Sequence, residues 1–194
     1  MSKMTKSHWV TDANTMRLTL PFAKVDTERR LVSGYATLDN LDSQGDVVLS
    51  EASADAFARA RGNIREMHQP IAAGHLVDFQ EEQFFDQETG KIYRGIFVTA
   101  YVSKGADSTW EKVLDGTLTG FSIGGEIVEQ ETQYVDDVQK AVRFVKDYDL
   151  IELSLVDNPA NPLANVFNIQ KSADGSVTKV SGMVAETRVE NVFY

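Results

Sequence analysis

The 194-residue chain contains no cysteine. This absence excludes disulfides, catalysis by a thiol and zinc sites built from cysteine. No apolar run approaches the roughly 20 residues that a membrane-spanning helix needs, and the polar N-terminus predicts no signal peptide. Basic residues are outnumbered, with 19 Lys and Arg against 29 Asp and Glu and a formal net charge of −10. A nucleic-acid-binding protein needs a basic surface, so that function is not expected.

Histidine is also scarce, and the three that occur are His8 in the polar N-terminal segment, His68 and His75. His68 and His75 are candidates for a general base, because only histidine has an ordinary pKa near neutrality. His68 shortly precedes Pro70, which predicts an extended backbone. A metal site of His68, His75 and Asp78 is a second interpretation. Pro70 and Gly74 disfavour it because they break any regular face between the histidines, and no cofactor is expected.

The hydrophobic fraction of 42% and the charged fraction of 25% are typical of a soluble globular protein. Strong strand patterns cover residues 31–38, 91–102, 118–127 and 149–156, and helix patterns cover 50–62 and 107–116. We expect Ser50 or Ser53 to cap the first helix, and Ser108 with Glu111 to form a capping box on the second. Residues 129–139 predict an acidic turn. The expected organisation is a flexible segment 1–16, a domain 17–167 and a tail 168–194.

Ser122 lies in a strand pattern in which Phe121 and Ile123 alternate with small or polar residues. It could be a nucleophile that a substrate backbone approaches, or an ordinary strand serine beside a bulge. Gly124 and Gly125 would leave room for that approach, which could occur by strand addition. Glu152 lies inside an apolar strand, so it is either exposed at an edge or held by a partner.

Four separated stretches, taken together, resemble the prohead maturation proteases of tailed bacteriophages. They are Gly34-Tyr35-Ala36 with Asp42 to Val48, Met67 to Pro70 with Ala73-Gly74, Leu114 to Gly125, and Glu152 to Pro162. That family is similar in fold to the herpesvirus assemblins, which are serine proteases. The resemblance therefore implies a mainly β (α+β) domain, an assemblin-like closed or partly closed β-barrel surrounded by short helices.

The resemblance also implies a serine endopeptidase with His68 as base and Ser122 as nucleophile. The assemblins use a second histidine as third residue, but no histidine follows His75. The phage enzymes look to use an acid, and Glu152 is the matching position, with Asp149 and Asp157 as the alternatives.

The implied substrates are the scaffold, the scaffolding segment of the major capsid protein, and the protease itself, during procapsid maturation. The implied location is the host cytoplasm, inside the assembling procapsid. The tail 168–194 would be a propeptide or a scaffold-tethering segment, and the enzyme could form a homo-oligomer. Neither nucleic acid nor a membrane is an expected partner. The competing hypothesis is a non-catalytic β-barrel assembly or tube protein of a virion.

Overall fold

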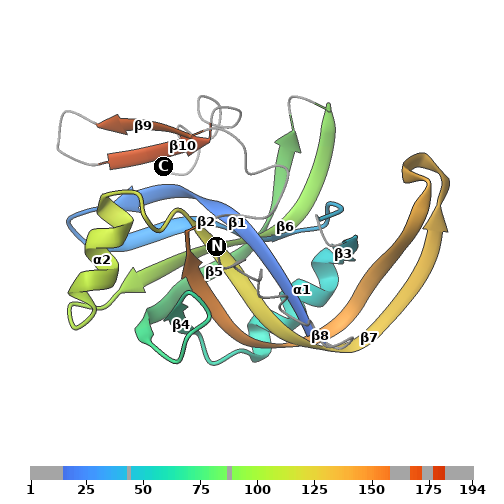
Figure 1. The fold of residues 1–194 in the computed structure, drawn as a ribbon, viewed down its shortest axis with the longest axis horizontal. Coiled ribbons are helices and arrows are strands. Elements are labelled where there is room, and N and C mark those ends of the chain that lie inside the picture. Colours follow the sequence, from blue (N-terminus) through green and yellow to red (C-terminus); the bar gives the residue numbers. More distant parts are fainter. Residues whose placement is uncertain (1–14, 43–44, 87–88, 158–166, 172–176, 182–194) are drawn as a thin grey trace, which may run out of the picture.

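The computed structural model describes residues 15–42, 45–86, 89–157, 167–171 and 177–181, which form a mainly β protein with two α-helices (Figure 1). The helices are α1 (Ser50–Arg59) and α2 (Asp107–Leu114), and a 3₁₀ turn, η1, covers Asp136–Val138. The strands are β1 (Thr15–Asp26), β2 (Leu31–Leu38), β3 (Asp46–Val48), β4 (Asn63–Glu66), β5 (Ala72–Asp86), β6 (Lys91–Val102), β7 (Gly120–Val135), β8 (Lys140–Val156), β9 (Phe167–Lys171) and β10 (Val177–Ser181).

The main sheet has eight strands in the order β3-β8-β4-β5-β6-β2-β1-β7, and β8 additionally pairs with β7. β8 runs parallel to β3 and β4, while the other pairings are antiparallel. The expected mainly β class with flanking helices is confirmed, whereas a closed barrel is not supported. The additional pairing matters for function because it sets the strand of Ser122 beside the strand of Glu152.

The hairpin of β7 and β8 is longer than expected. The predicted acidic turn at 129–139 is wrong, because β7 continues to Val135 and β8 begins at Lys140. Most side chains in the outer part of β7 are exposed, so this part lacks the alternation of a half-buried strand. Pairing with β8 forms the strand there, and the hairpin tip extends away from the rest of the sheet at the right of Figure 1.

The hydrophobic core combines side chains of the sheet with one face of each helix. The Phe22 and Phe121 rings meet edge to face at 4.9 Å, which joins β1 to β7. Phe57 of α1 and Trp110 of α2 are buried in the same core. Among the described residues, no helix is long and apolar enough to cross a membrane.

Neither helix has the side-chain cap that its sequence predicts. Leu49 and Ala106 occupy the N-cap positions without a capping hydrogen bond. The Ser50 hydroxyl instead donates to Glu81, and Ser53 Oγ accepts from the Tyr148 hydroxyl. The serines therefore join α1 to β5 and β8.

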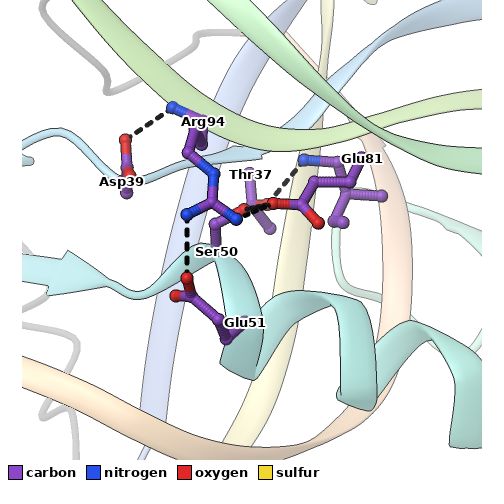
Figure 2. Close-up of polar contacts among 7 residues, drawn as sticks. Thr37, Asp39, Ser50, Glu51, Glu81 and Arg94 are labelled. Carbon is purple, nitrogen blue, oxygen red and sulfur yellow. Dashed lines mark hydrogen bonds and ion pairs between the residues drawn. The ribbon is translucent and has the colours of Figure 1, made fainter.

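Arg94 of β6 joins three further segments, as Figure 2 shows. Its guanidinium pairs with Glu51 at the start of α1 and with Glu81 of β5, while its backbone N–H donates to Asp39. Exposed ion pairs of this kind contribute modestly to stability. Their main effect is to fix the start of α1 against the β5–β6 hairpin.

Two terminal predictions fall mostly outside the described residues. Of the N-terminal segment 1–16, the structure describes only Thr15 and Met16, which begin β1. Within the tail 168–194, it describes most of a hairpin of β9 and β10, in which β10 contacts β1.

Candidate active site

His68 lies in a tight turn directly after β4. Met67 has φ 50° and His68 has φ 58°, and the Gln69 N–H donates to the Glu66 carbonyl at 2.8 Å. This is the pattern of a type I′ turn, and it costs about 1–2 kcal/mol for each side chain held at positive φ. The predicted extended backbone at His68 is therefore wrong. Pro70 restricts the residue directly before it, Gln69, and leaves His68 unconstrained.

Contacts from two neighbouring elements hold this turn. The Met67 N–H donates to the Leu155 carbonyl of β8 at 3.0 Å, and the His68 N–H donates to Ser154 Oγ at 3.3 Å. From the other side, the buried Glu66 carboxylate accepts from Thr109 and Lys112 of α2, each at 2.5 Å.

Burial alone would raise the pKa of Glu66. The hydrogen bonds from Lys112 and Thr109, together with the ammonium charge of Lys112, outweigh burial and hold that pKa below its ordinary value of 4.5. Glu66 is therefore ionised at neutral pH, and α2 anchors the strand end that carries His68.

Ser122 lies on β7, where its Cα partners are Thr19 of β1 and Ser154 of β8. Its Oγ is 2.9 Å from His68 Nε2. Ser122 is 0% exposed, and the His68 side chain is 11% exposed. In this conformation the Ser122 hydroxyl is therefore shielded from solvent.

Glu152 lies on β8 and contacts the other ring nitrogen of His68, so that Ser122, His68 and Glu152 form a contact chain. Its Oε1 is 2.5 Å from His68 Nδ1, and its Oε2 accepts from an Arg65 guanidinium N–H at 2.8 Å. The carboxylate is almost fully buried, so of the two alternatives left by the sequence, the partnered one is correct. A proton on Nδ1 directed at Glu152 leaves Nε2 as the acceptor for the Ser122 hydroxyl, which is the arrangement that general-base catalysis needs.

Gly124 and Gly125 have a different role from the expected one. A Cβ at 124 would lie 3.0 Å from Glu152 Cγ and Oε1, and a Cβ at 125 would lie 2.9 Å from the Tyr148 ring. The space beside both glycines is thus filled by side chains of β8 and is not open to a substrate backbone.

The other candidates lie apart from the contact chain. His75 is an exposed residue of β5 whose ring centroid is 5.2 Å from that of Tyr101. Asp149 faces Arg59 at 3.7 Å, and the Asp157 carbonyl accepts from the Thr119 hydroxyl. His8 lies outside the described residues, and within those residues no group of three or more His, Cys, Asp or Glu side chains could hold a metal ion.

The partners of these residues were not predicted from the sequence. Arg65 and Glu66 lie three and two positions before His68, but no pattern marks them as anchors. Ser154 shares the face of Glu152, and this period of two was the only signal that could have found it.

One family model matches residues 19–131, namely Peptidase_S78_2, with the description "Putative phage serine protease XkdF". The chain belongs to this family. The match includes His68 and Ser122 and ends before Glu152, so the contact of Glu152 with His68 is known from the structure alone. No curated protein and no solved structure matches the chain.

Proposed function

We propose that the protein is a serine endopeptidase in which Ser122 is the nucleophile, His68 the general base and Glu152 the residue that orients the imidazole. The observation that carries this proposal is the continuous contact chain from Ser122 Oγ through both ring nitrogens of His68 to Glu152, with distances of 2.9 and 2.5 Å. The three residues come from β7, the β4 turn and β8, and any two of them are 30 to 84 positions apart in the sequence. Membership in a phage serine protease family agrees with this chemistry.

Each member has a defined step. His68 Nε2 takes the proton of the Ser122 hydroxyl while Oγ attacks the carbonyl carbon of the scissile peptide. The imidazolium then gives this proton to the leaving amine, the C–N bond breaks, and an acyl-enzyme remains. Water attacks the acyl carbon while His68 takes a proton from it. The imidazolium then gives this proton to Ser122 Oγ as the bond between Oγ and the acyl carbon breaks, which releases the carboxylic acid product and restores the hydroxyl. Glu152 stabilises the imidazolium in both halves of the reaction.

Arg65 supports the third member. Its guanidinium occupies Glu152 Oε2, which leaves Oε1 directed at His68 Nδ1. A charge-assisted hydrogen bond of this kind fixes the plane of the carboxylate.

We propose that the substrates are the scaffold, the scaffolding segment of the major capsid protein, and the protease itself. The setting would be the assembling procapsid in the host cytoplasm. The support is the family of phage serine proteases together with the four sequence stretches that resemble prohead maturation proteases. Under this proposal, the tail 168–194 is a propeptide or tethering segment whose removal accompanies maturation.

The experiment compares the wild type with Ser122→Ala. Both proteins are incubated with a fluorophosphonate probe and, separately, with scaffold and major capsid protein of a tailed phage that encodes a member of this family. We expect the wild type to be labelled on the peptide that contains Ser122, to cleave at least one of the two proteins and to shorten near its C-terminus. Ser122→Ala should do none of these. Ser33→Ala, which changes a strand serine that is hydrogen-bonded to Thr99, should behave like the wild type.

The non-catalytic assembly protein remains the second candidate because Ser122 is 0% exposed. A wild type that is neither labelled nor shortened, and that cleaves neither protein, would favour this candidate over the protease.

A further inference from the structure

Ser154 is a fully buried polar residue at the centre of the site, and the mechanism above does not use it. It follows Glu152 by two positions on β8, so its side chain projects to the same face of the sheet. Its Cα partners are Ser122 on β7 and Arg65 on β4. The residue is 0% exposed, and its Oγ accepts a hydrogen bond from the backbone N–H of His68 at 3.3 Å.

This hydrogen bond gives the His68 N–H an acceptor on β8, outside the turn. In the turn from Glu66 to Gln69, the hydrogen bond that closes the turn uses the N–H of Gln69. The His68 N–H is directed at Ser154 Oγ, in a part-buried position where an N–H needs an acceptor. Ser154 supplies the acceptor.

β8 therefore contacts both the imidazole ring and the backbone of the catalytic histidine. Glu152 holds the ring through Nδ1, Ser154 holds the backbone through the N–H, and the Leu155 carbonyl holds the preceding N–H of Met67. Ring and backbone together determine where Nε2 lies relative to Ser122 Oγ. Because His68 has a positive φ, its backbone would relax toward the common region if it lost these contacts.

We propose that Ser154 is a positioning residue that fixes the backbone of His68 so that Nε2 faces the Ser122 hydroxyl. The inference rests on the proposed function, because it gives Ser154 a role only if His68 is the base. Ser154 acts through His68 and does not take part in the proton transfers.

The test measures the rate at which a fluorophosphonate labels Ser122, per folded molecule, across a pH series. In Ser154→Ala we expect the plateau rate to fall about tenfold to hundredfold, because a small misplacement of a general base is costly. The pH at which the rate rises should stay the same, since the change leaves the contacts of the imidazole with Glu152 in place. Ser154→Thr retains a hydroxyl acceptor and should recover most of the wild-type rate.

Ser53→Ala is the matched control. Ser53 is also 0% exposed, and its Oγ also accepts a hydrogen bond at 3.3 Å, from Tyr148 of β8. It lies on α1, and its hydrogen bonds are with Tyr148 and Leu49. Its variant should lose thermal stability to a similar degree but keep the wild-type labelling rate per folded molecule.

The outcomes distinguish a failure of the proposed function from a failure of the role given to Ser154. Labelling of Ser122→Ala at the wild-type rate would overturn the proposed function itself. An unlabelled Ser122→Ala together with a Ser154→Ala variant at the wild-type rate would overturn only the role of Ser154. If Ser154→Ala does not fold, Ser154→Thr decides: a folded Thr variant with a rate reduced tenfold or more would contradict positioning by the hydroxyl.

Discussion

Gly124 and Glu152 are direct cross-strand partners, and the Glu152 side chain fills the space in which a side chain at position 124 would stand. The close approach is 3.0 Å to both Cγ and Oε1 of Glu152, and Oε1 is the atom that contacts His68. The glycine is therefore part of the geometry that lets a carboxylate reach the imidazole.

Gly124→Ala should reduce activity with little effect on stability. The new methyl group would push the flexible end of Glu152 by a few tenths of an ångström and so misalign it from His68. The loss of backbone freedom in the unfolded chain, about 0.4–1 kcal/mol, should offset much of the crowding. We expect the rate of fluorophosphonate labelling to fall at least tenfold while the midpoint of urea unfolding changes little.

Gly125→Ala is the control for this prediction. Its Cβ would lie 2.9 Å from the buried Tyr148 ring and 3.0 Å from the Asp149 carbonyl, neither of which can move easily. Overpacking should lower the free energy of unfolding by about 1–3 kcal/mol. If both variants lost stability equally and labelling followed the folded fraction, the special role of Gly124 would be disproved.

Arg65→Met should weaken the orientation of Glu152. Loss of the nearby positive charge also makes the protonated imidazolium easier to form. In a plot of labelling rate against pH, the acidic limb, where the rate rises toward its plateau, should therefore move to higher pH. The side chain of Arg65 is 37% exposed, so solvent reduces both effects. We expect a roughly tenfold lower plateau, equivalent to roughly 1.4 kcal/mol of barrier.

Arg65→Lys separates charge from geometry. It keeps the charge but not the planar guanidinium, so the acidic limb should stay in place while the plateau falls. Arg29→Met, which removes an exposed ion pair with Asp26, should change neither quantity. An unshifted acidic limb in Arg65→Met would mean that Arg65 has no influence on the charge of the site.

Glu152→Gln should retain the shape of the third residue but lose its charge. An amide cannot stabilise the imidazolium as a carboxylate does, so we expect the labelling rate to fall by roughly 10²–10⁴. His68→Ala should match Ser122→Ala, because members of a triad act as a unit. A fully active Glu152→Gln would return the third role to Asp149 or Asp157.

The three proposed catalytic residues could be predicted from the sequence, while the contacts that position them could not. Ser122 and Glu152 lie in strands with clear apolar patterns, so their faces followed from a period of two. The meaning of the glycines did not follow, because it depends on which residue stands opposite on β8. Likewise, the turn conformation of His68 depends on Leu155 and Ser154, which are more than 80 positions away.

In the fold, too, some elements could be predicted from the sequence and others could not. The strands at 31–38 and 91–102 are observed as predicted, because burial on one or both faces leaves a strong apolar signal. The outer half of the β7–β8 hairpin has no such signal, since pairing of its backbone maintains it in solvent. The predicted cap of α1 is absent, and Ser50 and Ser53 are used instead in contacts with β5 and β8.

Protonation of Glu66 should destabilise the protein in acid. The folded-state pKa of Glu66 lies below the ordinary 4.5, so its contribution is fully present above that pH and is lost as the pH falls through the lower, folded-state value. In urea unfolding, Glu66→Gln should be less stable than the wild type at pH 7, and this difference should shrink below pH 4.5. Glu51→Gln is the control: Glu51 also has a lowered pKa, but its ion pair with Arg94 is exposed and screened, so it should show a smaller difference. A constant gap between wild type and Glu66→Gln across this range would contradict the ionised anchor.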